Sequence, residues 1–102
     1  MNRTIGRNTL VLVKLAENPD TPIGPVVAAI KFVDDYRPEL NVDRRYAEVN
    51  YMGGCIWYSV RKNFSTKDEG NDFFKQMKSE GYTVGTEQQF DEFIRRAGVL
   101  TY

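Results

Sequence analysis

The side chains that could do chemistry in this sequence are one cysteine and a loose group of carboxylates. Cys55 follows two glycines in the stretch YAEVNYMGGCIWYSVRK, residues 46–62. The chain contains no histidine, and histidine is the commonest general base, thiol activator and metal ligand. Because no histidine can deprotonate Cys55, we expect this residue to behave as a small hydrophobic side chain and not as a nucleophile.

The carboxylates in the middle of the chain are Asp34, Asp35, Glu39 and Asp43. Their spacing matches no calcium-binding loop, and the chain has no set of cysteines or histidines that could bind zinc. Gly53 and Gly54 are not followed by the lysine and helix of a phosphate-binding loop. The sequence therefore predicts a protein that is not an enzyme, with no catalytic residue, no metal site and no cofactor.

Composition indicates an ordinary globular protein. The chain has 102 residues, of which 41% are hydrophobic and 27% charged, and this length predicts a single domain over residues 1–102. Fourteen basic residues balance fourteen acidic ones, so no global charge attracts the chain to nucleic acid or anionic lipid. With one cysteine, no signal peptide and no apolar run that could span a membrane, we expect a cytoplasmic protein.

The first half of the chain predicts one strand and one ambiguous segment. Residues 8–16 (NTLVLVKLA) form a strand with little alternation, and the proline-rich residues 17–25 form a loop. Residues 25–36 place Val26, Ile30 and Val33 at helical spacing, which favours a helix. The alternative is a strand, because this segment is rich in β-branched residues. Residues 37–44 are predicted to be a loop.

A β-hairpin is predicted over residues 45–62, because alternating apolar runs flank two glycines that adopt a tight turn without steric cost. A two-residue turn at Gly53 and Gly54 pairs Asn50 with Trp57 and Val49 with Tyr58. Both strands then present their apolar residues on one face, which we expect to be the core face. Its residues are Ala47, Val49, Tyr51, Ile56, Tyr58 and Val60.

Two helices are predicted after the hairpin, over residues 66–80 and 87–97. Ser65 or Thr66 serves as the first N-cap, and Thr86 with Gln89 forms a second capping box; Gly81 and Gly98 are expected to end the helices. We expect both helices to pack on the core face of the hairpin. The fold class is therefore a small α+β domain, with an antiparallel sheet built around the 45–62 hairpin.

The stretch WYSVRKNFSTKDEGNDFFKQMKSEGY, residues 57–82, combines an amphipathic strand, a capping serine or threonine and a helix that ends at a glycine. In this order it is similar to the strand–helix half of a SPOR (sporulation-related repeat) domain, a peptidoglycan-binding fold. The resemblance therefore implies the local strand–helix order and no family membership.

The second face of the hairpin is the predicted partner-binding surface. It carries the only tryptophan of the chain among polar neighbours, a composition typical of protein-binding hot spots. In the alternative arrangement, one of the helices covers Trp57 and Met52. The residues expected to contact a partner are Tyr46, Asn50, Met52, Trp57 and Arg61.

The open end of the same hairpin provides a basic edge. The predicted register brings together Arg44, Arg45, Arg61 and Lys62, and these cations could contact phosphate. Asp43 and Glu48 lie among them, and a solvated charged edge that discourages sheet aggregation is the alternative interpretation.

Together these features predict a non-catalytic protein that binds another macromolecule by protein–protein contact. An accessory or inhibitory protein, such as a phage- or mobile-element-encoded modulator of a host defence or nucleic-acid machine, is the specific form that we expect. The alternative is a small nucleic-acid-binding protein that uses the basic hairpin edge. The sequence predicts no membrane partner and no particular oligomeric state.

Overall fold

The computed structural model describes residues 4–18, 24–54 and 56–101. This part of the chain forms a small α+β domain with a five-stranded antiparallel sheet and two C-terminal α-helices, as predicted. The elements in chain order are β1 (Gly6–Leu15), β2 (Val26–Arg37), the short 3-10 helix η1 (Pro38–Leu40), β3 (Val42–Gly53), β4 (Ile56–Phe64), α1 (Lys67–Ser79), β5 (Thr83–Gly85) and α2 (Glu87–Thr101).

The sheet has the strand order β4-β3-β2-β1-β5. β2 is its central strand and pairs with β1 on one side and β3 on the other, so the predicted helix over residues 25–36 is wrong. A central strand is buried on both faces, so its sequence need not alternate between apolar and polar residues. Its apolar residues can therefore also match the spacing of a helix. The predicted loop over residues 37–44 is shorter than expected, because β3 already begins at Val42.

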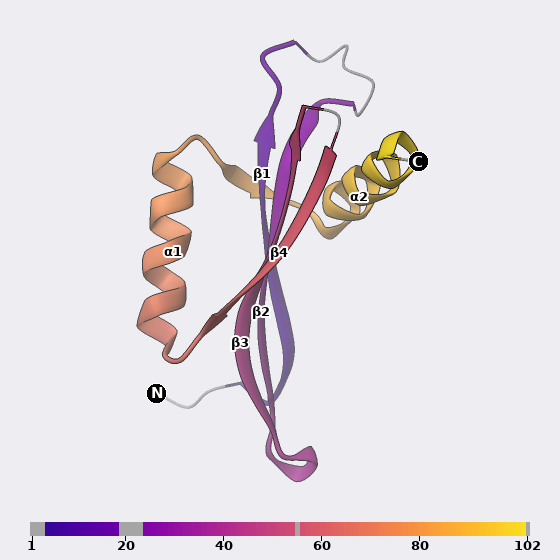
Figure 1. The fold of residues 1–102 in the computed structure, drawn as a ribbon. Helices are drawn as coiled ribbons and strands as arrows, with labels where there is room; N and C mark the ends of the chain where they lie inside the picture. Colours follow the sequence, from indigo (N-terminus) through magenta and orange to yellow (C-terminus); the bar gives the residue numbers. More distant parts are fainter. Residues whose placement is uncertain (1–3, 19–23, 55, 102) are drawn as a thin grey trace.

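The two helices cover opposite faces of the sheet (Figure 1), which corrects the prediction that both pack on one face. Neighbouring residues in a strand point to opposite faces, and in β1 both neighbours are apolar and buried. Val13 joins the cluster that contains Phe93 of α2, whereas Leu12 joins the cluster that contains Met77 of α1. Both faces of the sheet thus carry apolar residues that require cover.

The β3–β4 hairpin forms with a register two residues away from the predicted one. Gly53 pairs with Ile56 and Val49 pairs with Val60, so Gly53 stays in the strand and the turn begins after it. Only Gly54 of the two glycines has a positive φ, of 68°. Because the shift is an even number of residues, each side chain keeps the face that the sequence predicted.

Local signals correctly placed both helix starts. Thr66 Oγ1 accepts a hydrogen bond from the Glu69 backbone N–H at 3.3 Å. Thr86 and Gln89 form a reciprocal capping box, with bonds of 3.1 and 2.9 Å between backbone N–H groups and side-chain oxygens. Gly98 does not end the second helix, which continues to Thr101. The short strand β5 was not predicted and extends the sheet beside β1.

Candidate binding surfaces

The predicted partner-binding residues lie on the face of the sheet that α2 covers near the β3–β4 turn. Asn50 is 2% exposed and Tyr46 3% exposed, whereas Met52 and Trp57 are half-buried. Trp57 packs against the cluster that contains Phe93, and its Nε1 donates a hydrogen bond of 3.1 Å to Asn50 Oδ1. This arrangement is the alternative in which a helix of the same chain covers the tryptophan.

The opposite face of the hairpin, which the sequence assigned to the core, is open along most of its length. Ala47 is buried and Val49 half-buried beneath α1. Beyond the helix, four large side chains form what we call the hairpin patch. Its members are Tyr51, Ile56, Tyr58 and Val60, which are 39%, 55%, 41% and 51% exposed.

Within the hairpin patch the aromatic residues are held in place. Tyr51 and Tyr58 are directly paired across β3 and β4, and their rings stack with centroids 5.1 Å apart and planes inclined by 14°. A Cβ atom at Gly53 would lie only 2.6 Å from Tyr58 Cε2, so the Tyr58 ring covers the glycine backbone. The patch is therefore an ordered surface and not a set of loose side chains.

The hairpin patch borders an edge of the sheet, because β4 is the terminal strand in the sheet order and pairs with β3. The first half of β4, residues 56–60 (IWYSV), contains no charge and no proline, whereas Arg61 and Lys62 follow directly. Edge strands are usually protected by charges, prolines or bulges against pairing with another chain. The first half of β4 therefore lacks two of these usual protections.

The four cations of the predicted basic edge do not lie together. Arg45 Nε lies 3.9 Å from Asp34 Oδ1, and Lys62 Nζ lies 4.9 Å from the ring centre of Phe73 on the α1 side. Arg44 and Arg61 point to the other face of the sheet, because each is offset by one residue from these two. The predicted edge is thus divided between two faces.

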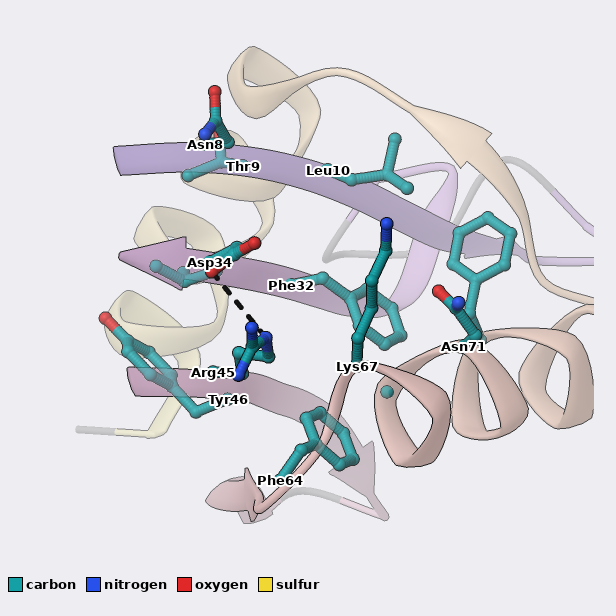
Figure 2. Close-up of a pocket in the computed structure, with 13 residues that line it drawn as sticks. Asn8, Thr9, Leu10, Phe32, Asp34, Arg45, Tyr46, Phe64, Lys67 and Asn71 are labelled. Carbon is teal, nitrogen blue, oxygen red and sulfur yellow. Dashed lines mark ion pairs between the residues drawn. The ribbon is translucent and has the colours of Figure 1, made fainter. Parts of the chain in front are cut away.

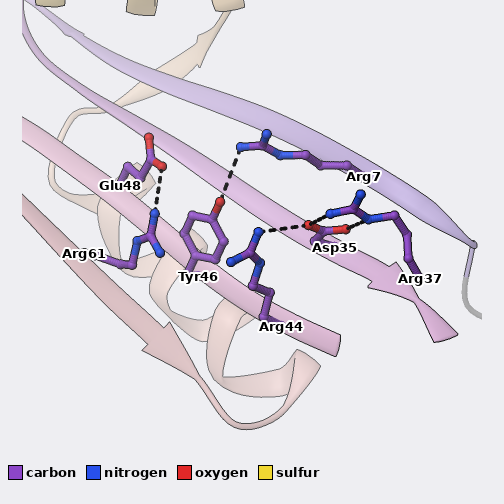
Figure 3. Close-up of polar contacts among 7 residues, drawn as sticks. All are labelled: Arg7, Asp35, Arg37, Arg44, Tyr46, Glu48 and Arg61. Carbon is purple, nitrogen blue, oxygen red and sulfur yellow. Dashed lines mark hydrogen bonds and ion pairs between the residues drawn. The ribbon is translucent and has the colours of Figure 1, made fainter. Parts of the chain in front are cut away.

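Arg44 and Arg61 instead join Arg7 of β1 and Arg37 of β2 around one buried carboxylate and one buried ring (Figure 3). We call this group the arginine cluster. Two members, Arg7 and Arg37, were not predicted from the sequence. Arg7 reaches the cluster only through the β1–β2 register. Arg37 follows Asp35 by two residues, a spacing that places both side chains on one face if residues 25–36 form a strand.

Asp35 is the centre of the arginine cluster. Its side chain is fully buried, and its oxygens accept two hydrogen bonds of 2.8 Å from Arg37 and one of 3.3 Å from Arg44. The hydrogen bond from Arg37 has the largest effect on the pKa of Asp35 and lowers it. Burial raises this pKa, but Arg37 and Arg44 together hold it below its ordinary value. Asp35 is therefore ionised at neutral pH.

A cavity of about 330 Å³ lies between the sheet and the start of α1 (Figure 2). Leu10, Phe32 and Phe74 provide apolar walls, and Arg45 and Lys67 are its cations. Among the described residues, Arg45 Nε is buried without a hydrogen-bond partner. The cavity has the size of a small-ligand site, but Asp34 also lines it and lies 3.9 Å from Arg45 Nε, so the charge of Arg45 is already partly balanced.

Comparisons with protein-family models, with curated proteins and with solved structures gave no match to this chain. Within the described ranges, no group of histidine, cysteine, aspartate or glutamate side chains is arranged to hold a metal ion. Over the same residues, none of the helices has the length and apolar character that crossing a membrane requires. Cys55 lies outside the described residues.

Proposed function

We propose that this chain is a non-catalytic protein that binds a partner protein through the hairpin patch and the free edge of β4. The observation that carries the proposal is the exposure of four large apolar side chains on and beside a terminal strand. Exposed apolar residues that form a contiguous patch mark interaction sites more often than scattered ones do. Aromatic residues with polar tips, such as Tyr51 and Tyr58, are common in such interfaces.

The partner supplies an extended segment that pairs with residues 56–60 as an additional strand. Main-chain hydrogen bonds to a free sheet edge provide affinity in this mode of recognition, and alternate side chains provide specificity. Ile56, Tyr58 and Val60 form one apolar row for the incoming strand. The charge of Lys62, which follows this stretch, favours a segment whose end carries an acidic residue at this position.

The predicted accessory or inhibitory role, including that of a phage- or mobile-element-encoded modulator of a host defence or nucleic-acid machine, belongs to the same proposal. Such proteins act by occupying a surface and need no catalytic group. The identity of the captured partner tests this part of the proposal directly.

The experiment compares the wild-type chain with an Ile56→Thr/Tyr58→Ser variant in affinity capture from a lysate of the organism that encodes it, after nuclease treatment. Both substitutions keep residues compatible with an exposed strand. The matched control is Val84→Thr, because Val84 is 58% exposed on the short strand β5 at the opposite edge of the sheet. Mass spectrometry identifies captured proteins, and hydrogen exchange of the purified complex locates the contact.

We expect the wild type and the control to capture the same partner, and the double variant to lose it. Truncation of a hot-spot residue costs about 2 kcal/mol or more, which corresponds to about a thirtyfold weaker Kd. In the complex, the amides of residues 56–60 should gain protection from exchange. Equal capture by the double variant, or protection confined to another surface, would refute the proposal.

A further inference from the structure

The arginine cluster lies on the same face of the sheet as α2, but at the opposite end, which α2 does not cover. This is the end where η1 joins β2 and β3 (Figures 1 and 3). The strand registers create it. Arg7 pairs with Asp35 across β1 and β2, and Asp35 pairs with Arg44 across β2 and β3. The three side chains therefore form one row across the sheet, with the carboxylate between two guanidinium groups.

Two of the four arginine charges are balanced within the cluster. Asp35 neutralises one charge through Arg37 and Arg44, and Glu48 Oε1 lies 3.4 Å from Arg61 Nη2. The nearby Glu87 at the start of α2 accepts a hydrogen bond from Thr9 and lies 4.0 Å from Lys31. Four guanidinium groups against the carboxylates of Asp35 and Glu48 leave these residues with a surplus of two positive charges.

Tyr46 positions the guanidinium groups. Its ring centroid lies 4.1 Å from Arg61 Cζ and 5.6 Å from Arg44 Cζ, and its hydroxyl accepts a hydrogen bond of 3.3 Å from Arg7 Nη2. Cation–π contacts of this kind hold an arginine in place without using all of its five N–H donors.

The cluster is nevertheless accessible to a ligand. The side chains of Arg37, Arg44 and Arg61 remain 38%, 51% and 50% exposed. The Tyr46 ring, in contrast, is buried beneath them and offers no face on which a base could stack. The surface is thus suited to phosphate groups and not to bases.

We propose that the arginine cluster binds the phosphate backbone of a nucleic acid without reading its sequence. Guanidinium groups match phosphate oxygens in charge and in fork geometry. The cluster extends over strands β1 to β4, which is three strand spacings or about 14 Å. It therefore contacts several phosphates of one chain at once, and a single phosphate ion engages only part of it.

The test measures binding of fluorescein-labelled, mixed-sequence oligonucleotides, single-stranded and duplex, by fluorescence anisotropy over a series of salt concentrations. The variants are Arg7→Gln and Arg61→Gln, because neither arginine contacts the buried Asp35 in the described hydrogen bonds. The matched control is Arg95→Gln, which removes the same charge from an exposed arginine paired with Glu92 on α2. Thermal melts verify that each variant is folded.

We expect binding that weakens steeply as salt rises and does not depend on base sequence. Arg7→Gln and Arg61→Gln should each weaken binding about tenfold, the effect of losing one charge-assisted contact. Each should also reduce the salt slope by about 0.7–0.9, the value for one phosphate contact. The control Arg95→Gln should bind as the wild type does.

Three results would overturn the inference. They are wild-type affinity in both cluster variants, an equal loss in Arg95→Gln, and binding of the cluster to anionic lipid vesicles without binding of either oligonucleotide. The Ile56→Thr/Tyr58→Ser variant should bind oligonucleotides normally, because the hairpin patch lies on the other face. Failure of the proposed protein interface and failure of this site can therefore be distinguished.

Discussion

Replacing Trp57 with alanine is expected to destabilise the fold, because a helix of the same chain covers part of the indole. Complete truncation of a buried aromatic residue costs about 3–5 kcal/mol, and the half-buried state of Trp57 reduces this contribution to about 2 kcal/mol. The variant also removes the donor that lies 3.1 Å from Asn50 Oδ1. An unsatisfied buried acceptor costs about 1–3 kcal/mol, so we expect a total loss of about 3–5 kcal/mol.

Urea denaturation monitored by circular dichroism measures this loss, and two further variants divide it into its parts. Trp57→Phe keeps an aromatic ring but removes the donor to Asn50, and should cost about 1–2 kcal/mol. Tyr58→Ala removes an exposed ring on the other face and should cost about 1 kcal/mol through its lost stacking with Tyr51. In the wild type, folding should partly protect the single tryptophan from iodide quenching.

The result that would refute this reasoning is a Trp57→Ala variant with wild-type stability and impaired binding of a partner. It would mean that the indole is free to contact another molecule, and that α2 does not stabilise this face.

Three further predictions test the faces, the packing and the charges. Val49→Asp should destabilise the fold by several kcal/mol, whereas Val60→Asp, its exposed partner across the hairpin, should cost far less in thermal melts. Gly98→Ala should stabilise α2 by about 0.5–1 kcal/mol because space surrounds it, whereas Gly85→Ala should destabilise because its Cβ would lie 2.8 Å from a buried valine methyl. The lowered pKa of Asp35 means that its contribution to stability is present above its unfolded-state pKa, near pH 4, and is lost as pH falls through the folded-state value. Asp35→Asn should therefore reduce stability at neutral pH and flatten the acid side of the stability curve, and an unchanged acid side would contradict the role of this carboxylate.

The features that could be predicted from sequence depend on residues close together in the chain. The capping box of Thr86 and Gln89 involves two residues on one turn of chain, and its hydrogen bonds are those expected. The hairpin is equally local, because alternating runs beside glycines leave few other ways to pair. The predicted register was wrong by two residues, because Gly53 belongs to the strand and the turn begins one residue later than predicted. A shift by two residues leaves each side chain on the predicted face of the hairpin.

Whether residues 25–36 form a helix or a strand could not be determined from the segment alone. Val26, Ile30 and Val33 satisfy a helical period and also suit a strand that is buried on both faces. Pairing with β1 and β3 decides between them, and both partners lie outside the segment. A central strand is thus defined by its neighbours more than by its own pattern.

The candidate surfaces show the same division between local and distant information. The alternation of residues 45–62 correctly separated the side chains of Trp57 and Tyr58 onto opposite faces. It could not indicate which helix covers which face, because that depends on how far along the sheet each helix packs. The face expected to be the core became the open one over the hairpin patch.

By itself, the sequence determined the α+β class, the hairpin, the helix starts and the two sets of side chains in each hairpin strand, because short-range sterics and hydrogen bonds act within a few residues. Tertiary structure alone decided that α2 covers Trp57 and that Arg7 and Arg44 lie on either side of Asp35. These positions depend on strand registers between segments far apart in the chain. The register of two strands is selected by the combined burial of all their paired residues, and the sequence of one segment does not include the residues of its partner.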